Sequence, residues 1–182
     1  MRLRSPLIIV AGLLGALSPH PLRRDTNHET PREVPGVSQD KAGQGGSMSA
    51  QHASGPFDVK AVQEGTPDKA EGSTLGRLSL DKQYHGALEA TGKGEMLTVG
   101  TDVQGSGAYV AVERVTGTLN GRSGSFALQH SGTMTQGVPK LNITVVPDSG
   151  SGQLVGITGK MDIVIENGKH SYVLDYTMPD KP

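Results

Sequence analysis

From residue 53 onward, apolar and polar side chains alternate along most of the chain. Six runs show this period of two, and their apolar members lie within residues 57–59, 78–84, 126–128, 141–145, 161–165 and 172–176. A period of two with one polar face is typical of antiparallel sheet, because successive side chains of a strand point to opposite faces. We therefore expect roughly eight to nine strands. No run shows the period of an amphipathic helix.

Turn-forming residues separate these runs. Asn120 with Gly121, and Asn167 with Gly168, supply the Asn-Gly pair of two-residue hairpins, whose central positions both need positive φ. Residues 146–154 (VPDSGSGQL) are expected to form a longer loop. Strands joined by short turns predict a meander, and closing it into a barrel removes the exposed edges. The predicted fold is all-β, a closed antiparallel barrel, with a two-sheet sandwich as the alternative.

The first 47 residues differ from the rest of the chain. Residues 7–17 form an apolar run after two arginines, with the length of a signal-peptide hydrophobic region but too short to span a bilayer. Residues 23–47 are polar and without period, so we expect them to be disordered. The predicted organisation is an extension at 1–47 followed by a single β-barrel domain at 48–182.

Met48 offers a second explanation of the extension. Residues 44–48 (QGGSM) can be encoded as CAA GGA GGN NNN ATG, which places a bacterial ribosome-binding sequence just before the methionine codon. In this interpretation residues 1–47 are an over-extended gene model and the protein is cytoplasmic. Export through a genuine signal peptide is the alternative, although residues 18–21 (SPHP) would fit a signal peptidase poorly.

Composition and motifs argue against several function classes. The 17 basic and 18 acidic residues leave a net charge of −1, which gives no electrostatic footprint for nucleic acid or an anionic membrane. The chain has no cysteine, so thiolate nucleophiles and disulfides are absent. No serine lies in a Gly-x-Ser-x-Gly elbow, and Ala87 stands where a phosphate loop needs its first glycine. His85, His130 and His170 lack metal-site spacing, so we predict neither a metal nor a cofactor.

Four stretches resemble the bacterial domain of unknown function 3224 family: SLDKQYHGALEATGKGEML, YVAVERVTGTLNGRSGSFALQHSGTM, VVPDSGSGQLVGITGKM and GKHSYVLDYTM. The stretch MSAQHASGPFDVK resembles the family's usual amino terminus, which independently favours Met48 as the start. The resemblance covers residues 48 to about 178. It implies a closed, eight-stranded barrel of the allene-oxide-cyclase type, and it brings no assigned reaction.

Histidines and tyrosines are the candidates for a polar site inside the barrel. His130 continues the phase of Phe126 and Leu128, so we expect it to point inward. We expect it near a strand end loosened by Ser131 and Gly132, at the end of the barrel that also carries His170 or one of the inward tyrosines. The candidate ligand-binding residues are His130, His170, Tyr172, Tyr176, Tyr84 and Tyr109. They would form either a polar mouth on an apolar pocket or a plug of mutually satisfied groups, and the sequence leaves both open.

Glu113 and Glu89 are the candidate catalytic residues. The strand AYVAVERV (108–115) can point Val110 and Val112 inward, or Tyr109 and Glu113. In the second phase Glu113 is buried, and a buried carboxylate would have a raised pKa and could act as a general acid or base. Glu89 presents the same choice.

Three functions remain consistent with the sequence. The first is a β-barrel that binds a small, largely apolar molecule, with no nucleic-acid partner and no membrane span. The second is a cofactor-free, isomerase- or cyclase-like enzyme that uses Glu113 or Glu89, an idea that rests on likeness of fold alone. The third is a filled barrel that acts by self-association as a homo-oligomer.

Overall fold

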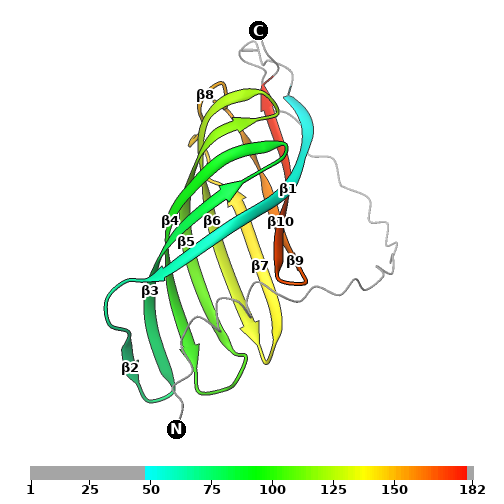
Figure 1. Ribbon diagram of the computed structural model, residues 1–182. Coiled ribbons are helices and arrows are strands. Elements are labelled where there is room, and N and C mark those ends of the chain that lie inside the picture. The colour runs from blue at the N-terminus through cyan, green and yellow to red at the C-terminus, as the bar shows by residue number, and fades with distance from the viewer. Residues whose placement is uncertain (1–47, 180–182) are drawn as a thin grey trace, which may run out of the picture.

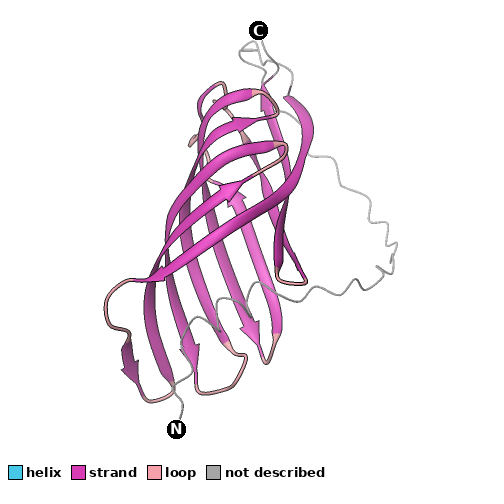
Figure 2. Cartoon of the chain, in the orientation of Figure 1, coloured by secondary structure: helices cyan, strands magenta, loops and turns pink. Residues whose placement is uncertain are grey.

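The computed structural model describes residues 48–179, and these form one antiparallel sheet of ten strands (Figure 1). The prediction for residues 1–47 lies outside the described residues. In chain order the strands are β1 (Met48–Gln63), β2 (Asp68–Ala70), β3 (Ser73–Tyr84), β4 (Leu88–Thr101), β5 (Gly107–Leu119), β6 (Arg122–Thr135), β7 (Val138–Val145), β8 (Ser151–Gly152), β9 (Thr158–Glu166) and β10 (Lys169–Pro179). The described residues contain strands, turns and loops but no helix, as Figure 2 shows.

Strand β1 closes the sheet into a barrel. Its first part pairs with β10, and from Phe57 onward it pairs with β3. Eight strands therefore complete the wall, while the short β2 and β8 add to β3 and β6. The predicted closed antiparallel meander is confirmed, and the sandwich alternative is wrong because one continuous sheet returns to its own first strand.

Three two-residue hairpins have positive φ at both central residues. The predicted turns are confirmed: φ is +46° and +79° at Asn120 and Gly121, and +52° and +77° at Asn167 and Gly168. A third such turn joins β6 to β7, with φ of +50° at Gln136 and +89° at Gly137. This turn was not predicted from sequence, because glutamine is not among the residues that favour positive φ.

The barrel wall is incomplete at one end. Strand β7 pairs with β9 only at Ile143 and Thr144, so no described strand pairs with the outer edge of residues 138–142. Figure 1 shows β3 to β7 continuing beyond the hairpin between β9 and β10. We call this the open end. Pro139 and Lys140 lie on the free edge, and both residue types discourage pairing with another chain.

A continuous apolar core fills the rest of the barrel. The loop after β7 contributes to it, because Leu154 and Ile157 are each only 1% exposed. This main core includes Leu88, Val115, Leu119, Phe126, Leu128, Met161, Leu174 and Met178. The predicted long loop thus covers the end of the barrel opposite the open end. Within the described residues, no helix is long and apolar enough to cross a membrane.

Candidate functional site

A polar layer lies between two apolar layers inside the barrel. Along each of β3, β5 and β6, the inward side chains follow the same sequence from the open end into the barrel. Apolar residues come first, polar residues follow, and the main core comes last. The polar members, which we call the polar cluster, are Lys82, Tyr84, Glu113 and His130. A separate apolar group, which we call the open-end cluster, consists of Leu78, Leu80, Met96, Tyr109, Ala111 and Met134. The polar cluster therefore forms the inner boundary of the open-end cluster.

Lys82 and Glu113 form a buried ion pair. The Lys82 Nζ lies 2.6 Å from Glu113 Oε2, and the two side chains are 6% and 0% exposed. The Tyr84 hydroxyl donates to Glu113 Oε1 at 2.9 Å, and Lys82 also contacts that hydroxyl at 3.3 Å. Both carboxylate oxygens are thus engaged, which a buried charge requires.

His130 is the incompletely satisfied member of the polar cluster. Its Nε2 lies 3.3 Å from Glu113 Oε2, but the approach lacks hydrogen-bond geometry, and no described group partners this nitrogen. The residue is only 3% exposed. A buried polar atom without a partner costs free energy, so its presence needs an explanation beyond stability.

Two glycines make room for the site. A Cβ on Gly92 would lie 1.9 Å from Glu113 Oε1, so the carboxylate occupies the space that any other residue at 92 would fill. A Cβ on Gly132 would lie 2.4 Å from Cε1 of Tyr109, whose ring therefore lies against the bare backbone of β6. Gly92 and Gly132 are as much part of the site as the charged residues.

The electrostatics of the cluster keep Glu113 ionised. Burial alone would raise its pKa, but the positive charge of Lys82 and contacts with His130 and Lys82 outweigh burial and lower the pKa to about 2. Burial, together with the charge of Glu113, raises the pKa of Tyr109 to about 12 and that of Tyr84 well above 10. Burial also lowers the pKa of His130. The predicted raised pKa for a buried Glu113 is wrong, because a buried lysine faces it.

Comparison with known proteins now identifies the family. The profile of the family described as "Protein of unknown function (DUF3224)" matches residues 53–176. The chain belongs to this family. A crystal structure of a DUF3224 protein of unknown function from Shewanella oneidensis MR-1 is 46% identical and superposes with a TM-score of 0.68. The match covers 73% of this chain and all of that one. No curated protein matches the chain.

The structure joins some predicted site residues of this DUF3224 protein. His130 points inward as expected and meets Glu113, which in turn binds Tyr84. Strand β5 adopts the phase that turns Tyr109 and Glu113 inward. The predicted position of His130 near a strand end is wrong, because β6 continues without a break through Gly132 to Thr135.

Three other predicted residues, Tyr172, Tyr176 and His170, make no hydrogen bond with the polar cluster, although the ring of Tyr172 packs edge-on against that of Tyr84 at 5.5 Å between ring centres. The Tyr172 hydroxyl accepts a hydrogen bond from the Leu88 amide at 2.8 Å. The Tyr176 hydroxyl donates a hydrogen bond to Gln51 Oε1 at 2.8 Å. His170 is half-buried, 5.2 Å from the Phe57 ring between ring centres. These tyrosines tie loops and strands together, and the six candidates do not surround one mouth.

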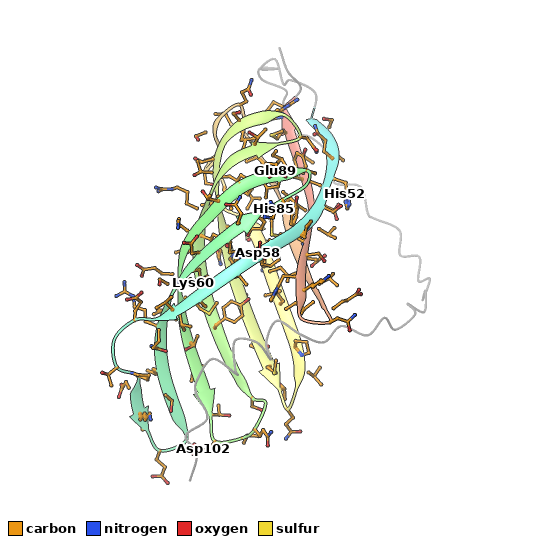
Figure 3. The ribbon with its side chains drawn as sticks, viewed as in Figure 1. His52, Asp58, Lys60, His85, Glu89 and Asp102 are labelled. Carbon is orange, nitrogen blue, oxygen red and sulfur yellow. The ribbon has the colours of Figure 1, made fainter. Side chains whose placement is uncertain are left out.

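Glu89 lies on the outside of the barrel. Its side chain is 61% exposed and lies beside His85, as Figure 3 shows. Glu89 Oε1 accepts a hydrogen bond from the Gly86 amide at 2.7 Å, which fixes the turn between β3 and β4. The candidate carboxylate at 89 is therefore part of a surface turn.

Lys82 and Gly92 were not among the site residues predicted from sequence. Lys82 lies in phase between inward Leu80 and inward Tyr84, so counting by twos along β3 would have placed a lysine in the interior. Its partner on β5 is 31 residues away, and sequence alone does not give the register that brings them together. Nothing in the sequence indicates that the Glu113 carboxylate occupies the space where a side chain at position 92 would lie.

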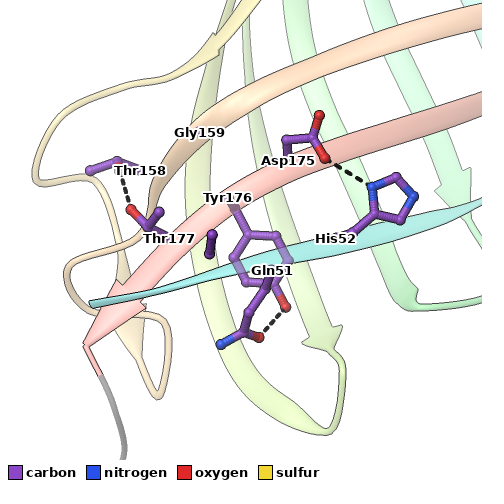
Figure 4. Close-up of a pocket in the computed structure, with 8 residues that line it drawn as sticks. Gln51, His52, Thr158, Gly159, Asp175, Tyr176 and Thr177 are labelled. Atoms are coloured by element: carbon purple, nitrogen blue, oxygen red, sulfur yellow. Dashed lines mark hydrogen bonds and ion pairs between the residues drawn. The ribbon is translucent and has the colours of Figure 1, made fainter. Parts of the chain in front are cut away.

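The outer wall carries a separate, shallow groove. It has a volume of about 450 Å³ and is lined by residues of β1, β9 and β10, including Gln51, His52 and Thr158 (Figure 4). Exposed His52 and Asp175 form a hydrogen bond of 2.9 Å, between His52 Nδ1 and Asp175 Oδ1, at this groove. Among residues 48–179, no group of three histidine, aspartate or glutamate side chains is close enough to hold a metal ion.

Proposed function

We propose that this DUF3224 protein binds a small, largely apolar molecule at the open end of the barrel. The observation that carries the proposal is the layering: an apolar cluster on the incomplete side of the wall, backed by a buried charged cluster with one unpartnered nitrogen. Sites for small molecules typically combine apolar lining with a few convergent polar groups. The layering supplies both.

The lining also supports adaptation to a ligand. Met96 and Met134 lie in the open-end cluster, and methionine has three rotatable bonds that let it repack around a guest. Tyr109 adds a large apolar ring with a hydroxyl. Because these side chains are nearly buried in the free protein, binding includes their displacement.

Binding fits the polar cluster better than catalysis by Glu113. A general base works best with a pKa near the working pH, whereas Lys82 and its neighbours hold the pKa of Glu113 at about 2. A cyclase- or isomerase-like reaction would need that pairing to break first. The enzyme alternative therefore ranks below binding.

Titration of the full chain with the neutral, environment-sensitive dye Nile red tests the proposal. We expect saturable binding with a blue-shifted emission, because the dye enters an apolar site. Ala111→Leu should weaken binding at least about tenfold, since it adds volume inside the open-end cluster. The matched control is Val112→Leu, the next residue along β5, which is 61% exposed on the outer wall.

Two results would count against binding at the open end. One is the absence of saturable binding to the wild-type protein. The other is an Ala111→Leu variant that stays folded by circular dichroism and binds the dye as tightly as the Val112→Leu control.

Self-association is the second candidate function, favoured by the outer face of β4 and β5. Leu97 and Val110 face each other across these strands, Val112 follows on β5, and all three are more than half exposed. Beside them Arg77 pairs with Glu95 and Lys93 pairs with Asp81, while Arg114, the next outward residue on β5, forms no ion pair among the described residues. A largely apolar sheet face with most of its charges paired suits a second copy of the same face.

Light scattering after size-exclusion chromatography tests the second candidate. A dimer that becomes a monomer when Val110 and Val112 are both changed to lysine supports it. The control is Val138→Lys, because Val138 is 70% exposed but lies on β7, away from this face. A wild-type monomer, or a dimer that persists in the double variant, contradicts it.

A further inference from the structure

The polar cluster leaves one group free to recognise a ligand. One carboxylate oxygen of Glu113 accepts a hydrogen bond from Lys82, and the other accepts one from Tyr84. Lys82 also donates to the Tyr84 hydroxyl. His130 Nε2 has no hydrogen-bond partner. Within the described residues, its one polar neighbour is Glu113 Oε2, at 3.3 Å and without hydrogen-bond geometry. A ligand acceptor that reaches His130 therefore competes only with this poorly aligned contact.

His130 offers a donor rather than an acceptor at this nitrogen. A bare lone pair on Nε2, 3.3 Å from the ionised Oε2 of Glu113, would face negative charge, so the tautomer with hydrogen on Nε2 is favoured. Burial lowers the pKa of His130, which disfavours the doubly protonated, charged form of the ring. The matching ligand atom is an acceptor such as a carbonyl oxygen.

The charge balance of the cluster selects against ionic head groups. Lys82 and Glu113 cancel, and a neutral His130 adds nothing, so the layer has no net charge to attract an ion. Lys82 Nζ and His130 Nε2 both approach Glu113 Oε2, at 2.6 and 3.3 Å. A carboxylate head at His130 would therefore be repelled by Glu113, and an ammonium head would meet a donor at Nε2 and would compete with Lys82 for Glu113. Either ion would also lose its hydration.

The route to His130 passes the open-end cluster. On β6 the next inward position toward the open end is Gly132, which has no side chain. The ring of Tyr109 covers that glycine, and Met134 follows. A chain-like apolar body lying among Tyr109, Met96 and Met134 would thus place its head at His130.

We infer that the ligand is a neutral amphipathic molecule whose carbonyl-type oxygen accepts a hydrogen bond from His130 Nε2. This inference rests on the proposed binding function and specifies its ligand class. The apolar body occupies the place of the open-end cluster. The head lies against the ion pair of Lys82 and Glu113 without replacing either partner.

A chain-matched series of competitors tests the inference on the full chain. Undecane, methyl nonyl ketone, undecanoate and undecylamine share a chain of similar length but differ in the head group, and each is titrated against bound Nile red. We expect the ketone to bind roughly threefold to tenfold more tightly than undecane, the range expected for one neutral hydrogen bond. Undecanoate and undecylamine should bind more weakly than the ketone.

Two variants assign the preference to His130. His130→Phe should bind undecane and the ketone equally, because the ring remains and the donor is lost. His130→Gln, which retains an N–H donor, should restore part of the preference. Thermal unfolding of both variants checks that they fold.

The possible failures are separable. If Nile red does not bind the wild-type protein saturably, the proposed binding function itself fails. If the dye binds but the four competitors displace it equally, or an ion displaces it best, binding stands and the ligand class is wrong. A ketone preference that survives in His130→Phe also overturns the inference.

Discussion

Lys82 and Glu113 depend on each other inside the barrel. Each removes the cost of burying the other's charge, so one partner left alone is an unpaired charge in an apolar interior. The pair lies between two apolar layers, and the nearest aromatic contacts of Lys82 are the rings of Phe57 and Tyr84, at 5.4 and 5.7 Å. Without Lys82, Glu113 keeps the Tyr84 hydroxyl and the neighbouring His130, and without Glu113, Lys82 keeps only the Tyr84 hydroxyl among the described residues.

Removal of either partner should destabilise the protein more than removal of both. We expect Glu113→Leu or Lys82→Met to cost about 3–5 kcal/mol, and the double variant to cost much less than either. Urea unfolding of the four proteins measures the cycle. A double variant that loses the sum of the two single losses would show that the side chains do not act as a pair.

Acid should weaken the barrel through Glu113. Its pKa is lowered from 4.5 to about 2 in the folded protein, so the group stabilises the fold fully above pH 4.5. That contribution is lost as the pH falls from 4.5 toward 2, at about 1.4 kcal/mol for each unit of the pKa difference. We expect wild-type protein to lose more stability than the Lys82→Met/Glu113→Leu variant between about pH 6 and about pH 3. If both proteins lose the same stability over this pH range, the protonation of Glu113 is not the cause of the acid sensitivity.

At the scale of strands and turns, the hairpin between β6 and β7 is the least favourable of the three matched turns. Gln136 has φ of +50°, where the other two turns place asparagine. Asparagine tolerates this conformation better because its short side chain bonds locally. The φ angles are similar in all three turns, so the residue at the first central position sets the intrinsic preference of each turn. The β6–β7 turn is also held by the Gln136 amide, which donates to Ser106 Oγ at 2.9 Å.

Gln136→Asn should stabilise the protein by about 0.5–1 kcal/mol, and the reverse change, Asn167→Gln, should destabilise it by a similar amount. Thermal unfolding measures both, and neither residue contacts the polar cluster. If Gln136→Asn lowers the midpoint, the side chain of Gln136 has a role that the turn geometry does not explain.

The elements of this fold could be predicted from sequence because each strand carries its own period and two turns carry Asn-Gly. The phase of His130 followed from Phe126 and Leu128 in the same way. The polar cluster could not be predicted from sequence, because Lys82 and Glu113 come together only through the registers of β3, β4 and β5. The pKa of Glu113 was mispredicted for that reason, since burial raises it and a distant lysine reverses the direction.

At the scale of the whole molecule, the barrel is closed at one end and incomplete at the other. Leu154 and Ile157 cover the main core, while the hairpin of β9 and β10 stops short of the far end of β7. The proposed binding site and the larger apolar core thus lie at different levels along the barrel axis.

The methionines report on this division directly. Met96 and Met134 lie in the open-end cluster, and Met161 and Met178 lie in the main core. In the full chain labelled with 13C at the methionine methyls, each signal can be assigned by a methionine-to-leucine variant. The central claim, that a small apolar molecule binds at the open end, is then tested by titration with methyl nonyl ketone. We predict saturable shifts of the Met96 and Met134 methyl signals, with Met161 and Met178 nearly unchanged. Shifts confined to Met161 and Met178, or no saturable shift at any of the four, would contradict the claim.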